Sequence, residues 1–363
     1  MATDAERLLR AYLAPTPLPR GSTSRDLVRR ALDFDAPARI PYSFWHPLRS
    51  DFCELTFVEE MLGTGPARPR EPGRPYRDEW GVGLRVSGGR FDHAVEHPLA
   101  DLDPAALAAH RFPDPAAPAR YAPLERWIAA ARRAGKFCVG FDPVLLYERA
   151  TELAGFETLL TAHRQRSAEL ATLFGRLADL TIAAIGRWAD LGVDAFMTWD
   201  DLGTQQGLPM GLAVFRQHYR PHYARIVAAA HGHGLRFIWH QCGDVPELIG
   251  EMLALGVDVV QLDQPRLIGH DRLAAEFGGR ICFWNAVDIQ WATQPQVSDA
   301  DLRREVAAMV APFAGRRGGF MARHYPHGGE IGLGPARERT IWRAFLGRGC
   351  ALRQSSRIRH AGG

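Results

Sequence analysis

Short apolar runs alternate with long amphipathic segments along most of the chain, and this alternation is its strongest structural signal. Seven runs of apolar, β-branched or aromatic residues have the length of buried strands; they occupy residues 39–45, 136–141, 193–199, 235–240, 257–262, 280–285 and 318–323. Between several of them apolar positions recur at helical spacing, as in residues 167–192 and 215–234. Strands and helices that alternate in this way predict βαβ units and a parallel sheet.

Seven strands around one core predict a single (β/α)8 barrel of the TIM type, in which one strand remains unassigned. A doubly wound open sheet is the alternative, but no G-x-G-x-x-G motif follows the first strand. Residues 79–99 hold two short strand-like runs around Ser-Gly-Gly, which predict an inserted β-hairpin that covers one end of the barrel. We expect an N-terminal helical segment that packs on the barrel (1–35), the barrel itself (36–350) and a flexible tail (351–363).

Composition narrows the class of protein. Of the 363 residues, 46% are hydrophobic and 23% charged, which is typical of a soluble globular protein with a sizeable core. The net charge of +3 comes without a basic run outside the tail, so we expect no nucleic-acid partner. No apolar stretch reaches the ~18 residues of a membrane span and the N-terminus lacks a signal-peptide core, which predicts a cytoplasmic protein without membrane contact. Five cysteines give no paired framework for disulfides.

Polar side chains gather where the predicted strands end, and barrel enzymes carry their chemistry at those ends. The ends, in chain order, are Trp45-His46, Asp142, Asp200-Asp201, His240-x-Cys242, Asp263-Gln264, Asn285 with Asp288, and Arg323-His324-Tyr325-Pro326-His327. The opposite ends of the strands carry residues typical of turns. This asymmetry favours a metal-binding or proton-transferring role for His240 and Cys242. An aspartate after a strand also caps the next helix, so Asp200 or Asp201 could have that structural role instead.

Four stretches resemble the uroporphyrinogen decarboxylase superfamily, in its decarboxylase-like and cobalamin-associated methyltransferase branch. They read DEWGVGLRVSGGRFDHAVEHPLAD, WDDLGTQQGLPM, AHGHGLRFIWHQCGDVPELIGEMLALGVDVVQLDQP and FWNAVDIQ. The resemblance covers residues 25–345 approximately, and its most specific part is 194–290. It implies a (β/α)8 barrel, in agreement with the pattern of strands.

The resemblance also implies a zinc site. Methyltransferase members hold zinc with a His-x-Cys after a central strand and a cysteine far downstream, and His240 and Cys242 match the first two ligands. The segment 318–335 offers no cysteine, so the implied third ligand is His327 or, in a second alignment, His324, with His327 favoured. Glu330 and Asp201 are next in line. No corrinoid-binding Asp-x-His-x-x-Gly motif is present, so a corrinoid would come on a partner protein or as a free cofactor.

We therefore expect a zinc-dependent methyl or alkyl transferase that activates a thiol or another nucleophile, with demethylation of a methoxylated substrate included. Asp200 or Asp201 is the candidate carboxylate for proton transfer or for orienting a small-molecule substrate. His46 and Tyr325 are further candidate catalytic residues, which with Trp45 would shape the pocket. A corrinoid protein and a homodimer remain open as partners.

Two other classes of function stay in view. One is a metal-free decarboxylase or lyase for a small carboxylate, and the other is a non-catalytic barrel that binds a tetrapyrrole or corrinoid. Decarboxylation of a porphyrinogen itself is disfavoured, because residues 41–52 offer only Arg49 where true uroporphyrinogen decarboxylases have an arginine-rich motif. Substrate carboxylates would then enter a desolvated cleft unpaired.

Overall fold

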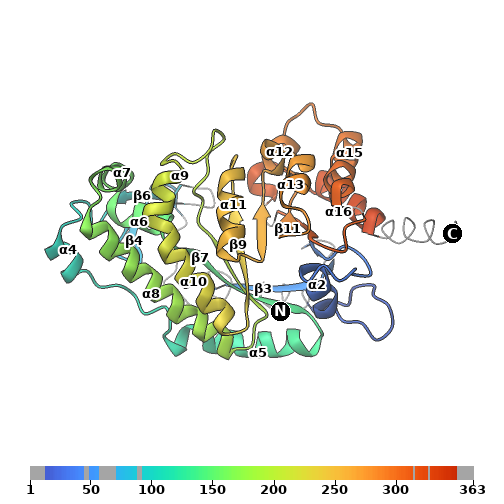
Figure 1. The fold of residues 1–363 in the computed structure, drawn as a ribbon, viewed down its shortest axis with the longest axis horizontal. Helices are drawn as coiled ribbons and strands as arrows, with labels where there is room; N and C mark the ends of the chain where they lie inside the picture. The colour runs from blue at the N-terminus through green and yellow to red at the C-terminus, as the bar shows by residue number, and fades with distance from the viewer. Residues whose placement is uncertain are drawn as a thin grey trace.

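Eight parallel strands form a nearly closed barrel with helices around it (Figure 1). The computed structural model describes residues 13–44, 49–56, 71–87, 92–313, 315–325 and 328–349. The barrel strands are β1 Tyr42–Phe44, β3 Phe52–Thr56, β7 Phe137–Val144, β8 Ala195–Trp199, β9 Arg236–Gln241, β10 Val259–Leu262, β11 Cys282–Asn285 and β12 Phe320–Arg323. All seven predicted strands are confirmed. The unassigned strand is β3, which the pattern did not separate from β1 because the segment between them is too short for a helix.

The outer layer consists of helices that connect one strand to the next, and of α16 after the last strand. They are α4 Pro104–Ala109, α5 Pro118–Arg133, α6 Tyr147–Ala154, α7 Phe156–Gln165, α8 Ala168–Asp190, α9 Leu212–Val214, α10 Arg220–Gly232, α11 Pro246–Leu255, α12 Pro265–Ile268, α13 His270–Phe277, α14 Ile289–Ala292, α15 Asp299–Val310 and α16 Pro335–Gly349. A π-helical turn, Phe215–Tyr219, precedes α10, and there the Arg220 N–H bonds the Phe215 carbonyl. Pro221 follows at once and has no N–H to donate. No helix in the described part of the chain is long and apolar enough to cross a lipid bilayer.

The sheet has a seam between β1 and β3. Its order is β2-β1-β12-β11-β10-β9-β8-β7-β3, where β2 (Arg49–Ser50) is a two-residue antiparallel strand beside β1. Asp51 joins the two sides: its N–H donates to the Tyr42 carbonyl at 2.9 Å and its side chain accepts the Tyr42 N–H at 2.9 Å. Arg39 pairs with the same carboxylate at 2.7 Å. The hydrogen bonds and the ion pair of Asp51 thus connect the two sides of the seam, where among the described residues no backbone ladder joins β1 to β3.

The barrel is filled by apolar side chains, and α2 (Ser24–Leu32) closes its N-terminal end. Thr23 and Asp26 form a capping box that starts α2. Val28, Ala31 and Leu32 pack against the inward-facing residues of the strands. Those residues are Phe52, Phe137, Val139, Ala195, Met197, Ile238, Val259, Cys282, Trp284 and Met321. Because residues alternate across a strand, the next inward positions toward the C-terminal ends can be read off; they are polar on β3, β9, β10 and β12 and aromatic on β7 and β8.

The insertion between β3 and β7 contains a three-stranded antiparallel sheet. Its strands are β4 Pro75–Arg77, β5 Gly83–Arg85 and β6 His93–Glu96. The predicted hairpin corresponds to β5 and β6, and β4 is an additional strand that the sequence did not indicate. The insertion packs on α6, where the Arg149 guanidinium lies 4.3 Å from the centre of the Trp80 ring and the Leu99 N–H donates to Leu153 O at 2.8 Å. Since α6 follows the C-terminal end of β7, the insertion lies beside that end of the barrel (Figure 1).

Candidate metal site

Three side chains converge at the C-terminal ends of β8 and β9. Asp201, His240 and Cys242 each present one ligand atom, and these atoms all lie within 4.8 Å of one another. His240 Nε2 is 3.4 Å from Asp201 Oδ1 and 3.5 Å from Cys242 Sγ. The parallel register that pairs Trp199 with His240 brings the residues after the two strands together. His240 is buried, while Asp201 and Cys242 are half-buried, so the cluster is open on one side.

A chain of hydrogen bonds fixes the His240 ring. Its Nδ1 bonds the Oε1 of Gln261, and Gln261 Nε2 donates to Asp263 Oδ1 at 2.7 Å. Gln261 lies opposite His240 in the ladder, on the inward face of β10. An amide oxygen accepts only, so Nδ1 carries a proton and Nε2 is the ring atom that faces Asp201 and Cys242. Metal-ligating histidines are usually oriented by such an outer partner.

Two loops bring the ligand atoms together by direct backbone contact. The Cys242 N–H donates to Asp201 Oδ1 at 2.9 Å, and the Asp244 N–H donates to Thr204 O at 2.8 Å. Gly243 has a φ of +90°, and a Cβ there would lie 2.5 Å from Thr204 O. A Cβ on Gly203 would lie 2.3 Å from Cys242 O. Both positions therefore require glycine, one for its backbone conformation and both for space.

Gly243→Ala is expected to destabilise the protein by about 1–3 kcal/mol and to weaken metal binding, since the methyl group separates the two loops. Urea unfolding and metal content after dialysis measure the two effects. The control is Gly250→Ala in the neighbouring helix α11, where a Cβ meets no atom within 4 Å. Alanine should stabilise that helix by up to about 1 kcal/mol. Equal behaviour of the two variants would contradict the role given to the loop contact.

The pKa values of the three side chains are those of a cluster in which a metal cation can replace a bound proton. Burial alone lowers the pKa of His240, but the Asp201 and Cys242 charges outweigh it and hold this pKa well above its ordinary value. Burial opposes ionisation of Asp201 too, yet His240 and the Cys242 N–H lower its pKa. Burial raises the pKa of the Cys242 thiol to about 11, although His240 counteracts it. Nε2 thus either donates a proton to Asp201 or offers its lone pair to a metal, which would also stabilise the thiolate.

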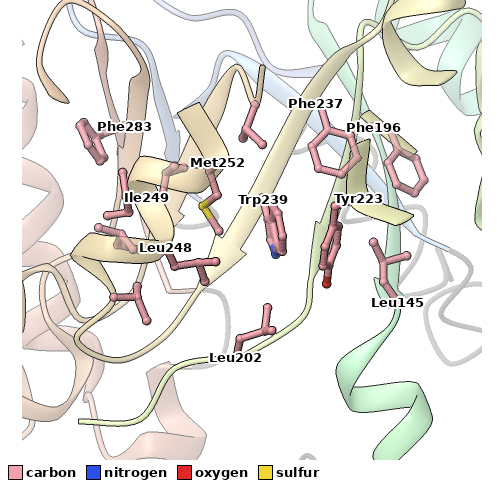
Figure 2. Packing of buried hydrophobic residues seen from close by; sticks show 14 of the residues in the cluster. Leu145, Phe196, Leu202, Tyr223, Phe237, Trp239, Leu248, Ile249, Met252 and Phe283 are labelled. Atoms are coloured by element: carbon pink, nitrogen blue, oxygen red, sulfur yellow. The ribbon is translucent and has the colours of Figure 1, made fainter. Parts of the chain in front are cut away.

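Asp200 has a different environment from its neighbour. Its carboxylate accepts the backbone N–H groups of Leu146, Tyr147 and Glu148 at 2.8–2.9 Å, at the start of α6. The Tyr223 hydroxyl also donates to it. Tyr223 in turn packs on Trp239 of β9, with ring centres 3.9 Å apart (Figure 2). This is the capping arrangement that the sequence allowed for one of the two aspartates.

Glu148 adds a carboxyl group beside these aspartates. Burial, with the charges of Asp200 and Asp201, raises its pKa to about 9, so it carries a proton at neutral pH. Burial also raises the pKa of Asp200, to about 6, against the lowering effect of its hydrogen bonds. The sequence did not single out Glu148, since it lies inside a helix rather than directly at a strand end.

The other predicted site residues lie in different places. The His324 imidazole is buried with its Nε2 3.7 Å from Glu338 of α16, and the described residues do not place it in the Asp201–His240–Cys242 cluster. Tyr325 follows β12 and is half-buried. His46 and His327 lie outside the described residues, as does the side chain of Glu330. These assignments stay predictions.

Sequence reasoning missed the residues that support the cluster. Gln261 was available as a signal, because it is a polar residue on the inward face of an apolar strand, two positions before Asp263. Gln241 also went unnoticed; its amide group bonds the Asp200 carbonyl and accepts the Leu202 N–H at 3.1 Å, which fixes the loop that carries Asp201. Gly203 and Gly243 could not be distinguished from ordinary loop glycines without the packing.

A family profile agrees with the predicted resemblance, and one solved structure agrees with the fold. Residues 147–321 match the sequence profile of the uroporphyrinogen decarboxylase (URO-D) family, which confirms the predicted resemblance. A methyltransferase from Methanosarcina mazei superposes with a TM-score of 0.50 at 14% identity, over 72% of this chain and 76% of that one. The carboxyl transferase domain of Rhizobium etli pyruvate carboxylase gives a TM-score of 0.28 at 12% identity, over 63% of this chain and 38% of that one. No curated protein matches the sequence significantly.

Proposed function

We propose that the protein is a zinc-dependent methyl or alkyl transferase whose metal is held by His240, Cys242 and Asp201. The spacing of the three ligand atoms supports this proposal best. Tetrahedral zinc with Zn–N and Zn–O of about 2.0–2.1 Å and Zn–S of about 2.3 Å separates N from O by about 3.4 Å and N from S by about 3.6 Å. The corresponding distances here are 3.4 and 3.5 Å.

The donor set and its surroundings fit zinc as well as the distances do. Imidazole nitrogen, thiolate sulfur and carboxylate oxygen are the three ligand types that zinc takes in proteins. Gln261 orients the imidazole and the Cys242 N–H orients the carboxylate, as outer partners do in zinc sites. We propose Asp201 as the third ligand in place of His327, which the resemblance favoured; His327 lies outside the described residues and stays a predicted alternative third ligand.

The chain's own residues prepare the site for a nucleophile and a small substrate. A bound zinc ion would supply Lewis acidity, which lowers the pKa of a substrate thiol or hydroxyl group at its open position. Trp199 and Phe141, with ring centres 4.5 Å apart, form an aromatic wall beside His240. The half-buried Asp201 carboxylate places a negative charge at the open side of the cluster.

The reaction class rests on relatives as well as on the cluster. The methyltransferase from Methanosarcina mazei shares the fold, and the URO-D profile covers the segment that carries His240 and Cys242. We propose a corrinoid, bound to a partner protein or free, as the other carrier of the methyl group. The second candidate is a metal-free decarboxylase of small carboxylates, which the URO-D match itself favours.

The test of this proposal is methyl transfer with methylcobalamin as the probe donor and small thiols as acceptors, followed by corrinoid absorbance. A second assay reverses the role of the corrinoid: cob(I)alamin is the methyl acceptor and a methoxylated aromatic compound is the donor. We expect turnover that requires zinc and disappears in Cys242→Ser. Two results together would establish the decarboxylase instead. The zinc-loaded protein would transfer no methyl group in either direction, and the metal-free protein would release CO2 from small carboxylates.

A further inference from the structure

An ion pair lies inside the barrel, below the Asp201–His240–Cys242 cluster. Arg323 Nη2 of β12 is 3.1 Å from Glu54 Oε2 of β3. Met321 and Phe52 lie two residues before them on the same strands and belong to the interior cluster, so Arg323 and Glu54 also face inward. Burial of two charges costs desolvation that their attraction seldom exceeds, and apolar residues would be at least as stabilising there. Stability alone therefore does not account for this pair.

The guanidinium of Arg323 keeps unused hydrogen-bonding capacity. Its carbon lies 4.5 Å from the centre of the Trp284 ring, and Nη1 is 3.6 Å from Met197 Sδ. A thioether is a weak acceptor, and within the described ranges it is the only hydrogen-bond partner of Nη1. Glu54, in contrast, is committed: Oε1 accepts the Ser43 hydroxyl at 2.5 Å and Oε2 faces Arg323.

Arg323 lies within reach of a molecule held at the cluster. Met197, its neighbour, precedes Trp199 by two residues on the inward face of β8, and Trp199 pairs with His240. Two residues along a strand span about 6.5–7 Å, which is the length of a substituted benzene ring. The side chains of Arg323 and Glu54 retain 10% and 11% exposure although both face inward, so solvent reaches them.

The charge of the pair selects the kind of ligand. The Glu54 carboxylate balances the charge of the Arg323 guanidinium, so the pair has no net charge while Nη1 stays a strong hydrogen-bond donor. Glu54 would repel the carboxylate of a ligand. A neutral oxygen acceptor meets no such repulsion. The aromatic wall of Phe141 and Trp199 suits a flat ring.

We propose that Arg323 and Glu54 form a subsite for the neutral oxygen of a small aromatic substrate of the phenol or aryl ether class. Arg323 Nη1 donates to that oxygen, and the ring extends along Trp199 toward the cluster. That the ligand at this subsite is the substrate of methyl transfer rests on the proposed function. The subsite itself needs no metal.

The test compares phenol, benzoate and toluene as probes for protein with 13C-methyl-labelled methionine, with and without zinc. The Met197 methyl resonance, assigned with Met197→Leu, reports binding next to Arg323. We expect phenol to bind at least about tenfold more tightly than toluene or benzoate, the value of one hydrogen bond from a charged donor. Glu54→Gln should reverse the order of phenol and benzoate, because it leaves the guanidinium charge uncompensated.

Substitutions of Arg323 complete the test. Arg323→Met should abolish the preference for phenol over toluene, while Arg317→Met on the exposed surface should leave it unchanged. If Arg323→Met does not fold, Arg323→Lys decides, since it keeps a cation for Glu54 but loses the planar fork. A wild-type preference for benzoate, retention of the phenol preference in these variants, or no saturable shift of Met197 would overturn the proposal. Titration of metal-free protein separates this result from failure of the zinc proposal.

Discussion

His240→Ala and Cys242→Ala are each expected to lower zinc affinity by more than about 100-fold, beyond the 10–100-fold typical of an outer-shell partner. Either change removes one of three converging ligand atoms. The free energy of unfolding of the metal-free protein should change by no more than about 2 kcal/mol, because the cluster lies at the strand ends, away from the apolar interior. Elemental analysis after dialysis and urea unfolding without metal measure the two quantities.

The matched controls are His233→Ala and Cys138→Ala. His233 is exposed after α10, and Cys138 is buried on β7 away from the cluster. Both variants should retain a full equivalent of zinc. If Cys242→Ala retains as much zinc as Cys138→Ala does, the three converging side chains are not a metal site. The metal-free decarboxylase is then the better proposal.

Adjacent aspartates should respond in opposite ways to the same substitution. Asp200→Ala is expected to destabilise the protein by about 3 kcal/mol or more, because three backbone N–H groups and the Tyr223 hydroxyl lose their acceptor in a buried place. Asp201→Ala should leave stability within about 1 kcal/mol but lower zinc affinity by about 100-fold or more. Urea unfolding and zinc content, measured on both variants, separate the two roles.

His327→Ala extends this comparison to the ligand favoured by the sequence. If His327 binds zinc in place of Asp201, His327→Ala loses the metal and Asp201→Ala keeps it. If Asp201 is the third ligand, the reverse holds. Stable, zinc-free Asp200→Ala protein would contradict the capping role assigned to that residue.

The barrel and the ligand pair His240 and Cys242 could be predicted from the sequence for simple physical reasons, while Asp201 was predicted as a candidate carboxylate and only next in line as a ligand. Buried parallel strands are apolar runs, so seven of them were visible, and a polar residue that ends such a run faces the active side of a barrel. His240 and Cys242 are two residues apart on one chain segment, and their proximity follows from spacing alone. Strand β3 was missed because it lacks the helix that separates other strands.

Contacts between distant segments could not be predicted in the same way. Asp201 and His240 meet because β8 and β9 pair in register, and the choice between Asp200 and Asp201 depends on which side chain faces α6. Arg323 and Glu54 come from strands at distant places in the chain and meet across the seam of the barrel. Such pairs form only when the barrel closes, and the sequence pattern of a single strand does not show which strands will then be neighbours.

Zinc-edge X-ray absorption of protein purified without added metal shows whether His240, Cys242 and Asp201 hold zinc. We predict about one zinc per chain, with one sulfur neighbour at about 2.3 Å and nitrogen or oxygen neighbours at about 2.0–2.1 Å. The sulfur neighbour should be absent in Cys242→Ser. A wild-type protein with no zinc edge, or with zinc that has no sulfur neighbour, would rule out zinc binding by Cys242.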